Sequence, residues 1–321
     1  MTFKIQPKPV QSASYEQFEV RAEEGGRYAI DVSLPPGYVA GGAPLPIILA
    51  TDGNYLFDLT RQLVHGGHAR MVGVLPPSIV VGVGYPTDEG MASFYARRTC
   101  DFYDEWDMRD QIGQRLQGLF GKMKAAEGKP ALVMRAGGFP RFIRFLRDEL
   151  LPTLADHYPI DPKGRHTLLG DSSGGSFVLR AMYEPNSPFS RYVSISPPLG
   201  CASGTIQKAE AAYAAKDEDL DADLFICCGQ QELNDQTNAF AGIVSGITWA
   251  AEQFAIRNWP SARIEWEIMN NEDHASIAPR AIAAGLRSVH RLRPGVHAEE
   301  LKKANATMSE EFSRSRRQTG G

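Results

Sequence analysis

The stretch LLGDSSGG at residues 168–175 decides the fold of this 321-residue chain. Residues 170–174 within it match the pattern G-x-S-x-G, which occurs once in the sequence. The apolar run HTLLG leads into the pattern, and a segment with apolar residues at helical spacing leads out of it. In such a strand–turn–helix setting the serine stands on a sharp, strained turn, and the glycines let the backbone pass without Cβ clashes. The pattern therefore predicts that Ser172 is a nucleophile.

Strand and helix patterns alternate on both sides of this stretch. The short apolar runs LPIILA and SIVVGV are typical of strands covered on both faces, as in a parallel sheet. Two earlier stretches of alternating polarity, separated by EEGG, predict an antiparallel hairpin. This order predicts an α/β fold with a mostly parallel central sheet, an N-terminal antiparallel hairpin and helices on both faces. The strands are expected at 15–22, 27–34, 45–50, 78–83, 166–169, 192–196, 223–228 and 263–269, and the helices at 55–72, 142–156, 174–183, 238–257 and 277–292.

Two segments fit this alternation less well. Residues 101–138 are rich in charge and lack a strand pattern, so they predict an insertion that caps the active site or, equally, a plain surface excursion. An amphipathic helix is expected within it at 111–124. The polar segment from 293 to 321 predicts a C-terminal helix and tail. With no internal boundary in view, we expect 1–321 to be a single domain with its core at about 15–292.

A serine nucleophile needs a base, and seven histidines compete for that role. His274 lies in the polar loop NNEDHAS after the last expected strand, where the α/β-hydrolase fold places its base. The acid is then expected between Ser172 and His274 in the chain. Glu232 follows the strand DLFICC and is the predicted acid, while Asp235 and Asp273 remain alternatives. The order Ser, acid, His predicts the α/β-hydrolase fold.

A tetrahedral intermediate at Ser172 would need two backbone N–H groups aimed at its developing negative charge. The first is expected from Ser173, directly after the nucleophile. The second is expected from Asn54, in the turn TDGN that follows the strand LPIILA. An ordinary turn is the competing interpretation of that segment.

Composition excludes several other classes of protein. The formal net charge of −4 gives no basic footprint for nucleic acid. No signal-peptide pattern is visible at the N-terminus, and no apolar run approaches the ~20 residues that a membrane span needs. The four cysteines form no CxxC pair, and the adjacent Cys227 and Cys228 suit buried strand residues that stay reduced. The pair His65 and His68 lacks a third metal ligand. We therefore expect a cytoplasmic protein without metal, cofactor, membrane or nucleic acid, and leave open whether it forms a homo-oligomer.

Several motifs together resemble those of a known family. The runs TDGNYLFD, IVVGVGYP, ARRTCDF, FLRDELLP, GDSSGG and EDHAS are similar to the putative-esterase family of α/β-hydrolases, which includes siderophore (enterobactin-type) esterases and esterase D-like hydrolases. The segment RRTCD at 97–101 is similar to the Arg-Arg-Thr-Tyr-Asp motif of the siderophore-esterase branch, with Cys100 in place of the aromatic residue. By this resemblance, Ser172 and His274 carry over as nucleophile and base. Some siderophore esterases work with a weak or absent acid, so the resemblance leaves open whether any acid completes the triad.

The adjacent residues Arg97 and Arg98 follow the strand IVVGVGYP at the edge where α/β sheets bind ligands. Paired guanidiniums there could bind an anionic group of the substrate. Alternatively, one of them pairs with Asp101 and holds the loop. Both interpretations stay open at the level of sequence.

The leading functional hypothesis is a serine hydrolase that cleaves a small-molecule carboxylic ester through an acyl-enzyme intermediate. An acyltransferase or a thioesterase could use the same three residues. A catalytically inactive hydrolase fold that serves as a binding protein is the alternative outside enzymes. The complete Ser–acid–His order favours the enzyme.

Overall fold

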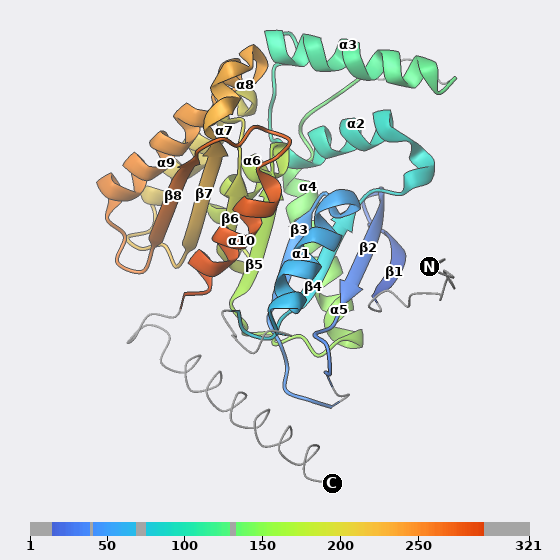
Figure 1. Cartoon of the computed structure of the whole chain (residues 1–321), viewed down its shortest axis with the longest axis vertical. Coiled ribbons are helices and arrows are strands. Elements are labelled where there is room, and N and C mark those ends of the chain that lie inside the picture. The colour runs from blue at the N-terminus through green and yellow to red at the C-terminus, as the bar shows by residue number, and fades with distance from the viewer. Residues whose placement is uncertain (1–14, 39–40, 69–74, 129–132, 292–321) are drawn as a thin grey trace, which may run out of the picture.

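The computed structural model describes residues 15–38, 41–68, 75–128 and 133–291 of the chain. Within them, eight strands form one sheet in the order β1-β2-β4-β3-β5-β6-β7-β8 (Figure 1). The strands are β1 (Glu16–Arg21), β2 (Arg27–Ser33), β3 (Ile47–Thr51), β4 (Ile79–Gly84), β5 (His166–Asp171), β6 (Phe189–Ile195), β7 (Asp223–Gly229) and β8 (Arg263–Met269).

The pairing of the strands confirms the predicted sheet. β1 pairs with β2 in the antiparallel sense, and β2 pairs with β4 in the same sense. The five pairings from β4 through β3 to β8 are parallel. Every residue of β3 and β4 is buried, because helices cover both faces of these central strands.

Helices cover the two faces of the sheet, and side chains alternate between the two layers along each strand. In β3, Ile48 and Ala50 pack with the core side chains of α1 and α10, whereas Ile47 and Leu49 belong to the larger core on the other face. The longer helices are α1 (Gly53–His68), α2 (Met91–Phe102), α3 (Gln111–Ala126), α5 (Leu151–His157), α6 (Ser173–Met182), α7 (Thr205–Ala214), α9 (Ile243–Arg257) and α10 (Ala278–Val289), and the shorter ones include η1 (Thr87–Glu89), α4 (Phe139–Arg144), η4 (Gln230–Asn234) and α8 (Gln236–Phe240).

The predicted insertion contains the end of α2 and the whole of α3. The expected helix at 111–124 is present as α3, and Asp110 caps it by accepting from the Gly113 backbone N–H at 2.6 Å. Figure 1 shows α3 beyond the carboxyl ends of the strands, above α2 and next to α8. Arg115 of α3 donates to the Thr237 hydroxyl of α8 at 3.0 Å, so α3 is tied across this end of the molecule.

The expectation that no apolar run could span a membrane is wrong by length and composition. One stretch in the described residues, Gln236–Arg257, is long and apolar enough to cross a membrane. About a third (33%) of its most apolar part is buried inside the protein. The chain breaks there at Gly242, whose φ is 66°, and forms α8 and α9. Ile243, Ile247 and Phe254 of α9 are buried in the core, so part of the apolar character of this segment serves packing inside the protein.

Two buried histidines couple the stability of the fold to pH. His166 accepts from the Ile47 backbone N–H at 3.2 Å, and His290 contacts the Thr167 hydroxyl at 3.0 Å. Burial lowers the pKa of His166 to about 4, and burial together with the Arg191 charge holds the pKa of His290 well below its usual range.

We therefore expect the free energy of unfolding to fall as the pH drops from about 6.5 to about 4. In that window the unfolded chain binds a proton on His166 while the folded chain does not, and the shift corresponds to about 3 kcal/mol. Urea unfolding at pH 7.5, 5.5 and 4.5 measures the change. The slope against pH should be smaller in His166→Gln, and an unchanged slope in that variant would contradict the assignment.

Candidate active site

Ser172 stands at the sharp turn between β5 and α6. Its backbone angles are φ 57° and ψ −124°, a strained combination for a residue with a side chain. A Cβ on Gly170 would lie 2.4 Å from the Gly174 carbonyl oxygen, and one on Gly174 would lie 2.6 Å from Thr51 Oγ1. Glycine is therefore required on both sides of the serine, which is the steric reason for the G-x-S-x-G spacing.

His274 reaches Ser172 from the loop between β8 and α10. Its Nε2 lies 3.1 Å from Ser172 Oγ, and its Nδ1 lies 3.2 Å from Glu232 Oε1. Residues 102 positions apart in the chain thus meet at hydrogen-bond distance. The carboxyl ends of parallel strands share one edge of the sheet, and this is where the three side chains converge.

Glu232 lies in η4, directly after β7, and its side chain is fully buried (0% exposed). Its Oε1 also accepts from the Ser196 hydroxyl at 2.6 Å. Burial alone would lower the pKa of His274, but the hydrogen bond to Glu232 and the charge of Asp171 outweigh burial and raise it. The site therefore stabilises the protonated imidazole.

The other two candidate acids have local structural roles. Asp235 caps α8, because its Oδ1 accepts from the backbone N–H groups of Thr237 at 2.7 Å and Asn238 at 3.0 Å. Asp273 accepts from the two backbone N–H groups that follow His274, both at 2.9 Å. These bonds lower the pKa of both carboxyls. Of the three acids, the structure brings Glu232 to Nδ1 of His274.

We expect Glu232→Gln to lower kcat for ester hydrolysis by about 10³-fold, because the amide cannot stabilise the imidazolium that forms during proton transfer. The acid limb of the pH–rate profile should also move to lower pH. Hydrolysis needs neutral His274, and the substitution removes a bond that raises the pKa of that histidine.

The matched control for Glu232→Gln is Asp235→Asn, which changes a neighbouring carboxylate that caps α8. It should leave kcat within about twofold while costing about 1 kcal/mol of stability at most. Steady-state kinetics from pH 5 to 9 compare the two variants. An acid limb that stays in place in Glu232→Gln would show that this carboxylate does not act on His274.

Sequence reasoning missed a second buried acid, Asp171, which is the x before Ser172 in the pattern. Burial raises the pKa of Asp171 to about 6, against the lowering effects of His274 and Arg98. Asp171 Oδ1 is a buried oxygen for which the described residues supply no hydrogen-bond donor. Its position directly before the serine in the pattern was the available signal.

The two expected N–H donors each belong to the first turn of a helix. Ser173 is the first residue of α6, and Asn54 is the second residue of α1. First-turn amides have no partner within their helix, and the helix dipole favours negative charge near them. The Asn54 side chain is fixed by two hydrogen bonds of 2.8 Å to the backbone N–H and carbonyl of Tyr85. Thr51, the last residue of β3, lies against Gly174 of the nucleophile turn, as the distance given above shows.

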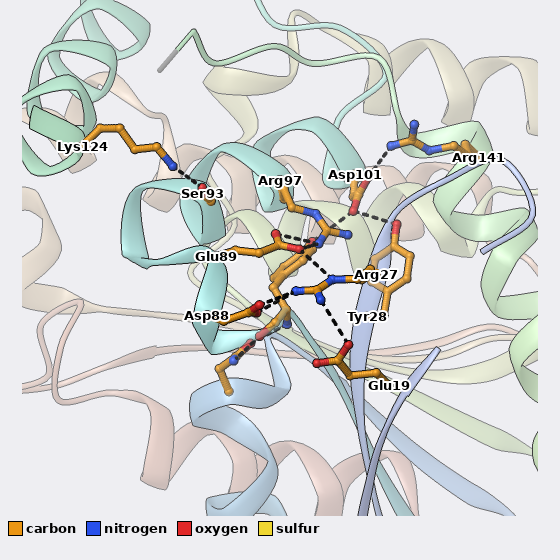
Figure 2. A network of polar contacts seen from close by, with 12 residues as sticks. Glu19, Arg27, Tyr28, Asp88, Glu89, Ser93, Arg97, Asp101, Lys124 and Arg141 are labelled. Atoms are coloured by element: carbon orange, nitrogen blue, oxygen red, sulfur yellow. Dashed lines mark hydrogen bonds and ion pairs between the residues drawn. The ribbon is translucent and has the colours of Figure 1, made fainter. Parts of the chain in front are cut away.

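The structure does not support the expectation that Arg97 and Arg98 bind substrate, because both guanidiniums are engaged within the chain. The two residues lie in helix α2, not in a loop. Arg97 donates to both Glu89 carboxylate oxygens at 2.9 and 3.0 Å, and its guanidinium lies over the rings of Tyr28 and Tyr85. Figure 2 shows this side chain directed toward Glu89, beside Arg27.

Arg98 projects from α2 in a different direction from Arg97 and is buried in the protein. It donates to the two carboxylate oxygens of Asp52 at 2.9 and 2.6 Å. The alternative that one arginine holds Asp101 is also replaced, because Asp101 accepts from Arg141 at 2.9 Å and from the Tyr28 hydroxyl at 3.0 Å (Figure 2). Both arginines therefore have structural partners, but not the one that the sequence suggested.

No group of three or more His, Cys, Asp or Glu side chains that could hold a metal ion occurs in the described part of the chain. His65, one member of the HGGH pair, contacts the Ser33 hydroxyl at 3.3 Å and the Ser78 carbonyl at 3.2 Å.

Comparison with known proteins agrees with this architecture. The model of the putative esterase family matches residues 122–265, a segment that contains Ser172 and Glu232 and ends before His274. The chain is 26% identical over 270 residues to the ferri-bacillibactin esterase BesA of Bacillus subtilis (strain 168), covering 82% of this chain and 85% of the relative. It is 28% identical over 196 residues to the siderophore triacetylfusarinine C esterase of Aspergillus fumigatus, covering 60% and 59%.

A solved structure shows the same fold. The BES protein from Bacillus cereus superposes with a TM-score of 0.71 at 22% sequence identity, covering 91% of this chain and 100% of that one. At this identity the likeness establishes the α/β-hydrolase fold. The two named relatives are esterases, and the family model that matches is that of putative esterases.

Proposed function

We propose that this chain belongs to the putative esterase family of α/β-hydrolases and that it hydrolyses a carboxylic ester through an acyl-enzyme intermediate on Ser172. One observation carries the proposal. A continuous hydrogen-bonded chain runs from Glu232 through both ring nitrogens of His274 to a serine on a strained turn. This is the geometry of an activated nucleophile whose base is oriented by a third group.

In the acylation step, His274 Nε2 accepts the Ser172 proton while Oγ attacks the ester carbon. Buried Glu232 accepts from Nδ1–H and stabilises the imidazolium as it forms. The backbone N–H groups of Ser173 and Asn54 are the donors that we assign to the oxyanion. When the tetrahedral intermediate collapses, His274 gives its proton to the departing alcohol and the acyl group stays on the serine.

Deacylation repeats these roles with water as the nucleophile. His274 takes a proton from the water, the second tetrahedral intermediate forms, and its collapse returns the proton to Ser172 Oγ as the acid leaves. Ser172 is partly exposed, which gives water and substrate access to the nucleophile.

For the substrate, we propose a siderophore ester. The two relatives described above are named as esterases of siderophores, and the alignment with BesA covers most of both chains. We also propose that the protein works in the cytoplasm. Its four cysteines are free, and three of them are buried, as suits a reducing compartment.

The test combines an activity-based probe with a substrate panel. A fluorophosphonate should label the purified chain on Ser172, as peptide mapping would show. Ferri-bacillibactin, triacetylfusarinine C, p-nitrophenyl acetate and an acyl thioester should then be compared by kcat/KM. We expect the siderophore esters to be the best substrates, while a chain that is neither labelled nor active on any ester would refute the proposed function.

A further inference from the structure

We propose that Arg98 is a positioning residue: through Asp52, it holds the loop that carries the second oxyanion donor against the nucleophile turn. The inference rests on the proposed function and goes beyond it, since Arg98 touches none of the reacting atoms. The observation behind it is a buried, two-pronged ion pair between α2 and the loop after β3.

The ion pair is enclosed by the protein. The Arg98 side chain is 7% exposed and that of Asp52 is 0% exposed. Two parallel N–H···O bonds of 2.9 and 2.6 Å fix the plane of the carboxylate as well as its position. A lysine could supply the charge but not this planar fork.

Asp52 is the residue through which the pair would act on the site. Its φ of 51° lies in the left-handed region, where a side chain is unfavourable, so its surroundings must hold it there. Its carbonyl accepts from the N–H groups of Tyr55 and Leu56, both at 3.1 Å, and thereby begins α1. The direction of the Asn54 N–H therefore depends on the conformation of Asp52, which Arg98 fixes.

The same guanidinium also contacts the nucleophile turn. Arg98 Nη2 lies 3.4 Å from the carbonyl oxygen of Asp171, the residue before Ser172. The carboxylate of Asp52 lies close to Gly174 in the same turn, as a Cβ there would be 3.2 Å from its Oδ2. One ion pair thus bridges the two loops from which the oxyanion donors come.

Helix α2 is a firm support for Arg98. Arg97 of the same helix is bonded to Glu89, and Asp101 is bonded to Arg141 and Tyr28, as Figure 2 shows. These contacts tie α2 to β2, η1 and α4. The two adjacent arginines therefore have different roles. Arg97 holds α2 in place, and Arg98 connects α2 to Asp52 at the site.

A positioning role predicts an effect on kcat with little effect on KM, since oxyanion stabilisation acts in the transition state. We expect Arg98→Lys and Asp52→Asn each to lower kcat on p-nitrophenyl acetate by about 10²-fold, with KM within about threefold. The second-order rate of fluorophosphonate labelling should fall in parallel, because phosphonylation also builds negative charge on an oxygen at the site.

The matched control is Arg257→Lys. Arg257 of α9 makes the same kind of two-pronged bond, at 2.6 and 3.1 Å, to the buried carboxylate of Glu210, and neither residue takes part in the site. It should leave kcat and the labelling rate within about twofold. Thermal unfolding of all variants shows which are folded, and Asp52→Asn, which keeps the shape of the side chain, supplies the test where Arg98→Lys does not fold.

Three results would overturn the inference: an unchanged kcat in the folded variant, a raised KM at unchanged kcat, or an equal loss in Arg257→Lys. The second would assign Arg98 to substrate binding and the third to general stability. Failure of the proposed function is distinguishable, because the wild-type chain would then be neither labelled nor active. A labelled wild type with an equally reactive Arg98→Lys would refute the positioning role alone.

Discussion

Replacing Ser172 with alanine is expected to lower kcat/KM for ester hydrolysis by at least about 10⁴-fold. The variant keeps His274 and Glu232 but has no oxygen that can form an acyl-enzyme. Any residual hydrolysis would come from the oxyanion donors and binding alone. Initial rates on p-nitrophenyl acetate and on the best siderophore ester, with gel fluorescence of the probe adduct, measure the loss.

The control for Ser172→Ala is Ser176→Ala, one turn further along α6. Ser176 is buried and lies in the same glycine-rich segment, so its replacement tests whether loss of any hydroxyl there has the same effect. We expect its kcat/KM to stay within about fivefold of wild type, in line with an ordinary buried Ser-to-Ala change. Probe labelling that survives in Ser172→Ala would disprove the assignment of the nucleophile.

The nucleophile was the part of the site easiest to predict, because its geometry depends on local sequence. Contacts within the turn and with Thr51 require glycine at positions 170 and 174. The sequence therefore shows two glycines at a fixed spacing around the serine. His274 was placed by topology instead. A polar loop after the last strand of a parallel sheet ends at the same edge as the loop after β5.

The acid was harder to predict, since three carboxylates lie in the right part of the chain. Glu232, Asp235 and Asp273 differ in what their oxygens contact, and that depends on the folded structure. For Asp235 a signal was available: an aspartate directly before a helical segment is a common N-cap, and this is the role it has. For Asp273 the competing bonds lie in a turn whose conformation the sequence pattern did not reveal.

The partners of Arg97 and Arg98 were not predicted because the sequence of α2 lacks the regular apolar spacing of a buried helix. Its buried residues include Arg98, Thr99 and Asp101 beside Phe94 and Phe102, so the apolar periodicity is interrupted. A buried arginine is stable there only because Asp52, far away in the chain, is buried opposite it. Such a pairing has no local signature, and adjacent residues of a helix point in different directions. The division of roles between Arg97 and Arg98 therefore became visible only in three dimensions.

Replacing His274 with alanine is expected to lower kcat by about 10⁴- to 10⁶-fold, comparable to the loss in Ser172→Ala. Without the imidazole, Ser172 Oγ has no base within hydrogen-bond distance among the contacts described above, and the leaving alcohol has no proton donor. The two losses should not add. In the double variant the rate should equal that of either single variant, because the residues act as one unit.

The control for His274→Ala is His157→Ala, which removes an exposed histidine at the end of α5 and should leave kcat within about twofold. Added imidazole sharpens the comparison. The space left by the side chain can admit a free imidazole, which should restore part of the activity of His274→Ala and none of that of Ser172→Ala. Rescue of this kind separates a missing base from a misfolded protein. A kcat for His274→Ala within tenfold of wild type would mean that another group deprotonates Ser172, and Asp171, buried beside it, would then be the first residue to replace.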